Sequence, residues 1–106
     1  MQAKDHGESF IALINAIQPD VTEISVQELA EKIENGDKFV LIDVREDCEW
    51  EIGRLYDAIH LSKGMIESEI EEAVADKSQD IVLYCRGGFR ALIAANLLQK
   101  MGYTNV

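Results

Sequence analysis

The chain has 106 residues, of which 47% are apolar, enough for a single domain with a closed hydrophobic core. Its formal charge of −10, from 20 acidic and 10 basic side chains, argues against general binding to nucleic acid or anionic membrane, because both require an excess of lysine and arginine. The N-terminus has no signal-peptide pattern, no apolar run is long enough to span a bilayer, and two cysteines make no disulfide framework, so we expect a soluble, cytoplasmic, reduced protein.

Residues 1–20 predict an N-terminal helical extension, because apolar residues recur at helical spacing until Pro19 ends the pattern. Ser25 and Glu28 then form a capping-box pattern in front of an apolar stripe, which indicates the start of a second helix. An Asn-Gly pair is the stop signal of that helix. The elements predicted for the first part of the chain are a helix at residues 10–17, a short strand at 21–24 and a helix at 26–35.

The remaining chain alternates between strand and helix patterns. Residues 39–42 form a continuous apolar run, which is typical of a strand buried on both faces of a parallel sheet. The further predicted elements are a helical turn at 46–52, a weaker strand at 58–61, a helix at 65–74, a strand at 81–84, a helix at 91–101 and the start of a strand at 105–106. This order predicts an α/β fold with a mainly parallel central sheet flanked by helices on both faces. Functional groups in such folds gather at the C-terminal ends of the strands.

The loop Cys-Arg-Gly-Gly-Phe-Arg stands at such a strand end and leads directly into a helix. Gly87 and Gly88 allow the backbone to curl with its N–H groups turned inward, and the helix adds the positive end of its dipole. Arg86 and Arg90 add full charges. Because all of these groups stabilise an anion, we expect Cys85 to be a reactive thiolate and the same donors to hold an anionic substrate beside it. A buried structural cysteine in front of a glycine turn is the alternative, and the two arginines argue against it.

The sequence resembles single-domain members of the rhodanese (thiosulfate sulfurtransferase) family over residues 22–106. The matching blocks are Leu-Ile-Asp-Val-Arg-Glu at 41–46, Ala-Ile-His-Leu at 58–61, Ile-Val-Leu-Tyr-Cys-Arg-Gly-Gly-Phe-Arg at 81–90, and the helix to Gly-Tyr at 102–103. The resemblance implies a rhodanese-like domain at 21–106, with Cys85 as the sulfur-accepting nucleophile. It also implies that the backbone from Arg86 through Phe89 to Arg90 forms the anion cradle.

The reaction implied by the resemblance is ping-pong transfer through a Cys85 persulfide, with no metal or organic cofactor. A small anionic sulfane donor such as thiosulfate loads the cysteine, and cyanide or a thiol, which includes a protein thiol, removes the sulfur. The resemblance places Asp43 and Arg45 beside this loop as a pair that supports it, with a simple surface salt bridge as the alternative. Arg90 is expected to brace the loop and Phe89 to lie at the rim of the pocket, whereas the direction of Arg86 stays open.

Two other functions stay open on the same fold. A phosphatase or arsenate reductase is the first, and the loop disfavours it, because only four residues separate Cys85 from Arg90 and the loops of those enzymes are one residue longer. The sequence also offers no convincing general acid for a phosphate leaving group. The second is a non-catalytic regulatory or sulfur-relay module. Oligomeric state does not follow from the sequence, and Cys48 is expected to be a spectator.

The sequence departs from the family pattern in three places. Gly-Arg-Leu-Tyr-Asp-Ala at 53–58 stands where many members have Gly-His-Ile-Pro-Gly-Ala, so that Arg54, Tyr56 and Asp57 replace His, Pro and Gly. Ala91 stands where many members have a hydroxyl residue. The family also leads us to expect a Gly-Gly segment and a final helix after Val106, which this sequence lacks.

Overall fold

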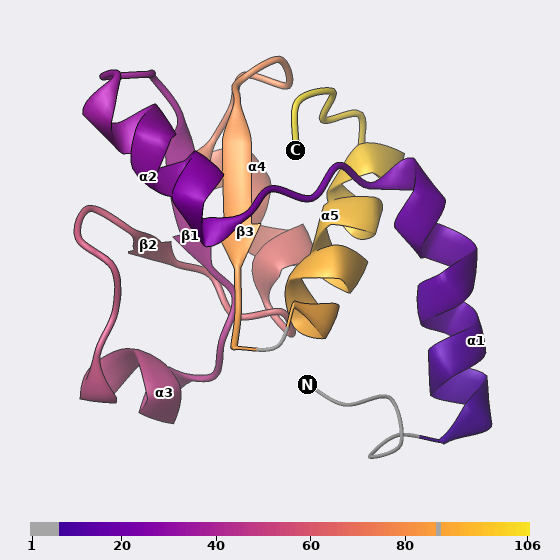
Figure 1. Ribbon diagram of the computed structural model, residues 1–106. Coiled ribbons are helices and arrows are strands. Elements are labelled where there is room, and N and C mark those ends of the chain that lie inside the picture. The colour runs from indigo at the N-terminus through magenta and orange to yellow at the C-terminus, as the bar shows by residue number, and fades with distance from the viewer. Residues whose placement is uncertain (1–6, 87) are drawn as a thin grey trace.

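The structure of the protein is a computed structural model that describes residues 7–86 and 88–106. Within these residues, a sheet of three parallel strands lies at the centre, in the order β2-β1-β3 (Figure 1). The strands are β1 (Val40–Asp43), β2 (Ile59–His60) and β3 (Ile81–Tyr84). Leu41, Ile42 and Asp43 of the central strand are at most 5% exposed. This confirms the sequence prediction of a strand buried on both faces, although the strand covers Val40–Asp43 and the sequence pattern predicts 39–42.

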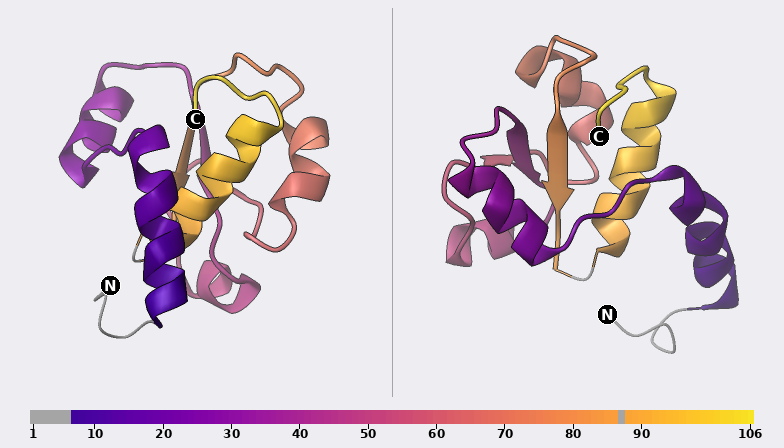
Figure 2. Two further views of the ribbon diagram at one scale, coloured as in Figure 1. Left: turned by 90° about the vertical axis from the view of Figure 1, so that its right-hand side faces the viewer. Right: turned by 45° about the horizontal axis from the view of Figure 1, so that its top comes forward.

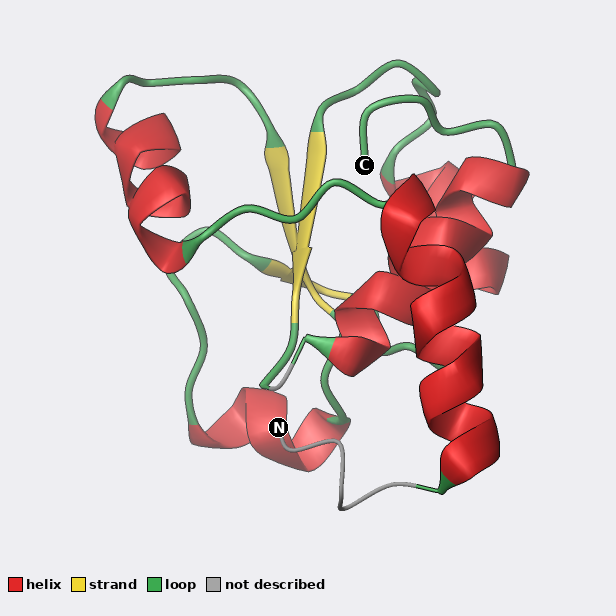
Figure 3. Ribbon diagram, turned by 45° about the vertical axis from the view of Figure 1, so that its right-hand side comes forward, coloured by secondary structure: helices red, strands yellow, loops and turns green. Residues whose placement is uncertain are grey.

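Helices lie on both sides of this sheet, as the alternating pattern predicts. They are α1 (Glu8–Ile17), the 3-10 helix η2 (Gln18–Asp20), α2 (Val26–Glu34), α3 (Asp47–Ile52), α4 (Ile66–Ala73) and α5 (Phe89–Lys100). Figure 3 shows α2 on one side and α4 and α5 on the other, and Figure 2 shows α1 packed outside α5. Ile14 is the α1 residue buried in that contact, at 4% exposure. Over the described part of the chain, no helix has the length and hydropathy needed to cross a bilayer.

Local signals in the sequence explain where the elements begin and end. Ser25 and Glu28 form the predicted capping box, because each backbone N–H donates to the other side chain at 3.0 Å. Gly36 follows the end of α2 with a φ of 71°, a conformation that glycine adopts without strain. Tyr103, 1% exposed, fixes the last segment because its hydroxyl donates to the carbonyl of Val74 at 2.6 Å.

Two predicted strands are wrong. Residues 21–24 and 105–106 are not strands in the structure. Both segments line a cavity of about 520 Å³ along β3. A strand requires a paired neighbour, and within the described residues β3 and the C-terminal segment share a single backbone hydrogen bond, from Ile81 N to Asn105 O at 2.8 Å.

Candidate active site

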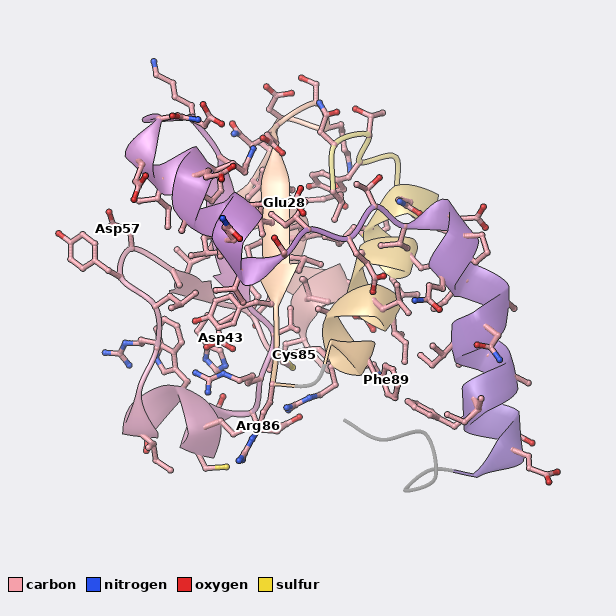
Figure 4. The ribbon with its side chains drawn as sticks, in the orientation of Figure 1. Glu28, Asp43, Asp57, Cys85, Arg86 and Phe89 are labelled. Atoms are coloured by element: carbon pink, nitrogen blue, oxygen red, sulfur yellow. The ribbon has the colours of Figure 1, made fainter. Side chains whose placement is uncertain are left out.

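Cys85 follows β3 directly and faces the first turn of α5 (Figure 4). Its Sγ accepts hydrogen bonds from the backbone N–H groups of Gly88 at 3.0 Å and Ala91 at 3.4 Å. Both donors belong to the N-terminal end of α5, whose dipole is positive there. Gly88 has a φ of 88°, a conformation that favours glycine, where the chain turns its N–H toward the sulfur. The other predicted loop glycine, Gly87, lies outside the described residues.

Arg90 lies in the first turn of α5 and pairs with Glu49 of α3. Its two terminal nitrogens donate to the two carboxylate oxygens of Glu49 at 2.6 and 3.1 Å. These hydrogen bonds, together with one from the backbone of Glu46, lower the pKa of Glu49 to about 2. The same pairing raises the pKa of Arg90. Arg90 therefore connects the start of α5 to α3.

Sequence reasoning missed Glu49, the partner of Arg90. The only local signal is the Glu-x-x-Glu spacing at the start of α3, where Glu46 N donates to Glu49 Oε1 at 3.1 Å. That spacing indicates a helix start and does not reveal a contact with α5. Arg86, by contrast, is exposed beside Cys85 (Figure 4), and no carboxylate partner is found for it among the described residues.

Asp43 and Arg45 form a pair at the end of β1, next to the end of β3 in the sheet. Arg45 donates its Nε to both carboxylate oxygens of Asp43 at 3.0 Å and its Nη2 to Oδ2 at 2.7 Å. Burial raises the pKa of Asp43, but hydrogen bonds from Arg45 and Tyr84 outweigh burial and hold that pKa below its usual range. Because Asp43 is 0% exposed, this pair is not a surface salt bridge.

The Asp43–Arg45 pair also holds one wall of the site. Arg45 Nη2 reaches the carbonyl of Gly53 at 2.5 Å, and the guanidinium lies 5.7 Å from the centre of the Tyr84 ring. The hydroxyl of Tyr84 accepts a hydrogen bond from Leu55 N at 3.1 Å. Two contacts from the ends of β1 and β3 thus fix residues 53–55, the first half of the 53–58 segment that departs from the family pattern.

Cys85 lines two spaces, the cavity along β3, which Gly88 and Ala91 also line, and a second cleft of about 470 Å³. The cleft is lined by Arg45, Glu49, Ile52, Gly53, Arg54, Leu55, Tyr84, Cys85 and Arg86. Phe89 is not among the residues that line this cleft, and its ring lies 5.7 Å from that of Phe10 in α1, at an angle of 58°. Cys48 is exposed on α3. Across residues 7–86 and 88–106, no three His, Cys, Asp or Glu side chains gather into a metal site.

Comparison with known proteins agrees with this architecture. The profile of the rhodanese-like domain matches residues 25–106. The chain belongs to the rhodanese-like domain family. Helix α1 and η2 precede the matched region of this rhodanese-like domain.

Two curated relatives of this rhodanese-like domain have sulfurtransferase names. A putative sulfurtransferase of Bacillus subtilis is 37% identical over 87 residues, which cover 82% of each chain. A sulfurtransferase of Allochromatium vinosum is 31% identical over 81% of this chain and 78% of its own. Among solved structures, a rhodanese with anions from E. coli matches with a TM-score of 0.63 and 30% identity, over 65% of this chain and 81% of that chain.

Proposed function

We propose that the protein is a sulfurtransferase that carries sulfane sulfur as a persulfide on Cys85. The observation that carries this proposal is the position of Cys85 Sγ, which accepts hydrogen bonds from two backbone N–H groups at the positive end of α5. Donors in this position stabilise a thiolate before the reaction and an ionised persulfide after it. The sulfurtransferase names of the relatives support the same chemistry.

Thiosulfate is the proposed donor. The Cys85 thiolate attacks the outer sulfur of thiosulfate, the S–S bond of the donor breaks, and sulfite leaves with the electron pair. The acceptor, which is cyanide in an assay or a thiol, then attacks the outer sulfur of the persulfide. The bond between that sulfur and Sγ breaks, and Sγ becomes a thiolate again. Both steps are nucleophilic displacements at sulfur in which the leaving group takes the electron pair, so neither step needs an external oxidant or reductant.

Phosphate transfer is disfavoured by the charge state of the cleft. A phosphatase needs a protonated acid for its leaving group, and Glu49 is the only carboxylate among the described residues that line the cleft. Its pKa of about 2 keeps Glu49 ionised at neutral pH, and both of its oxygens are bound to Arg90. Glu49 therefore has no proton to donate.

The proposal is tested by steady-state turnover of thiosulfate and cyanide, measured as thiocyanate. Double-reciprocal plots at several cyanide concentrations should be parallel, because the two substrates react in separate steps. Cys85→Ser should abolish turnover, whereas Cys48→Ser, which changes the exposed cysteine of α3, should retain it. Turnover that survives in Cys85→Ser would refute the role of Cys85 as the sulfur carrier.

A further inference from the structure

The second cleft that Cys85 lines carries an excess of positive charge in an otherwise acidic chain. Four of its lining residues are charged, namely Arg45, Glu49, Arg54 and Arg86. The charge of Arg45 is balanced by buried Asp43, and the charge of Glu49 is balanced by Arg90. Arg54 and Arg86 have no carboxylate partner among the described residues. Two guanidinium groups without a carboxylate partner therefore line one of the two spaces that reach Cys85.

Arg54 is held against the wall of this cleft by a stack of side chains. Its guanidinium carbon lies 4.3 Å from the centre of the Trp50 ring, and its Nη1 donates to the carbonyl of Trp50 at 3.2 Å. Trp50 also stacks on His60, with ring centres 4.8 Å apart and an angle of 11°. His60 is fixed in turn, because its Nε2 donates to the carbonyl of Arg45 at 2.8 Å.

This arrangement prepares Arg54 for a planar anion. Guanidinium has five N–H donors, and the structure uses one of them for the Trp50 carbonyl, so donors remain for a ligand. The planar fork matches a carboxylate, which it binds through two parallel hydrogen bonds. Ile52 and Leu55, exposed by 90% and 44%, line the same cleft and offer apolar contact for a short carbon chain.

We propose that Arg54 is a specificity-determining residue, and that it selects as sulfur acceptor a thiol that carries a carboxylate. The inference rests on the proposed function, since it concerns the second half of that reaction. The acceptor thiolate attacks the outer sulfur of the Cys85 persulfide, and the Sγ–S bond breaks. The acceptor leaves as a persulfide and the electron pair returns to Cys85, while Arg54 holds the carboxylate at the wall of the cleft.

The experiment isolates the acceptor step. The protein is loaded with thiosulfate, freed of excess donor, and checked by intact mass for one added sulfur. It is then mixed with 3-mercaptopropionate, 2-mercaptoethanol or cysteamine, which are similar in size and are anionic, neutral and cationic. The rate of sulfur loss is followed by rapid quenching and mass spectrometry. Comparing each thiol between wild type and variant cancels the different intrinsic reactivities of the thiols.

Arg54→Gln should slow the reaction with 3-mercaptopropionate by about tenfold, the effect of losing one charge-assisted carboxylate contact. The rate with 2-mercaptoethanol should be unchanged and the rate with cysteamine should rise. Arg54→Lys should restore part of the preference, because it keeps the charge and loses the fork. Lys100→Gln, at the far end of α5, removes one positive charge outside the cleft and should leave all three rates unchanged.

A second series identifies the source of the carboxylate. Small cysteine peptides with a free C-terminus are compared with the same peptides as amides. A slower reaction of Arg54→Gln with 3-mercaptopropionate, or with the peptides that have a free C-terminus, supports the inference. The class of thiol that is slowed shows whether the acceptor is a free mercapto acid or a peptide. If the ratio of the rate with the carboxylate acceptor to the rate with the uncharged acceptor is the same in wild type and Arg54→Gln, for the small thiols and for the peptides, the inference is overturned and the proposed function stays intact. Failure of wild type to gain sulfur on loading would instead overturn the proposed function.

Discussion

Replacing Glu49 with glutamine removes the negative charge that pairs with Arg90 and preserves the shape of the side chain. In the wild-type protein, the hydrogen bonds from Arg90 and Glu46 lower the pKa of Glu49 from its ordinary value of 4.5 to about 2. A lowering of this size corresponds to about 3 kcal/mol. Because about a quarter of each side chain, 24% for Glu49 and 25% for Arg90, is exposed, water screens the pair. We therefore expect Glu49→Gln to lower the free energy of unfolding by about 1 to 2 kcal/mol at pH 7.

The effect of Glu49→Gln should depend on pH with a defined sign. A carboxylate whose pKa is lower in the folded state stabilises the protein fully above its unfolded pKa, and this contribution is lost as the pH falls toward the folded pKa. The stability difference between wild type and Glu49→Gln should therefore be complete above about pH 5 and should close as the pH falls toward 2.

Urea unfolding at a series of pH values measures both effects. Glu51→Gln is the matched control, because Glu51 is an exposed glutamate on the same helix, and its replacement changes the charge by the same amount. It should change stability by less than about 0.5 kcal/mol. Equal stability losses in Glu49→Gln and Glu51→Gln, or a difference that does not change with pH, would contradict the assignment of Glu49 as the partner that holds Arg90.

Three further substitutions test other parts of the site. Gly88→Ala should lower the sulfur-loading rate and cost about 1 kcal/mol of stability in thermal unfolding, because the φ of 88° is strained for alanine; an unchanged loading rate would argue against the N–H at this position as a donor to the sulfur. Asp43→Asn should cost about 3 kcal/mol in urea unfolding at pH 7, because it leaves Arg45 without its buried partner, and a loss below about 1 kcal/mol would contradict that role. Phe10→Ala should lower stability by about 1 to 2 kcal/mol by removing the ring that contacts Phe89, and an unchanged melting temperature would show that α1 is not held there.

Local sequence patterns predicted the features that depend on local physics. The apolar run around Leu41 predicted the central strand, because a strand covered on both faces contains few polar residues. The glycines after Cys85 predicted a curled backbone, and Gly88 has the required positive φ. Asp57 also has a positive φ, 63°, at a position where the family resemblance leads us to expect glycine. Aspartate is among the non-glycine residues that tolerate this conformation best.

Contacts between distant segments were not predictable in the same way. Glu49 and Arg90 are separated by 41 residues, and no periodic pattern specifies which acidic residue of α3 meets α5. The stack that orients Arg54 likewise depends on the packing of α3 against β2. The apolar stripe of α2 predicted a helix correctly, but Val26 and Ile33 are 87% and 57% exposed, because periodicity does not tell what covers a face.

The central claim is that Cys85 becomes a persulfide, and intact mass spectrometry tests it most directly. Reduced protein is mixed with thiosulfate and measured beside Cys85→Ala, with circular dichroism to show that both are folded. The account predicts a gain of one sulfur atom in the wild type, located on Cys85 by peptide mapping, absent in Cys85→Ala and removed by cyanide. A folded wild-type protein that gains no sulfur, or a gain that persists in Cys85→Ala, would contradict the account.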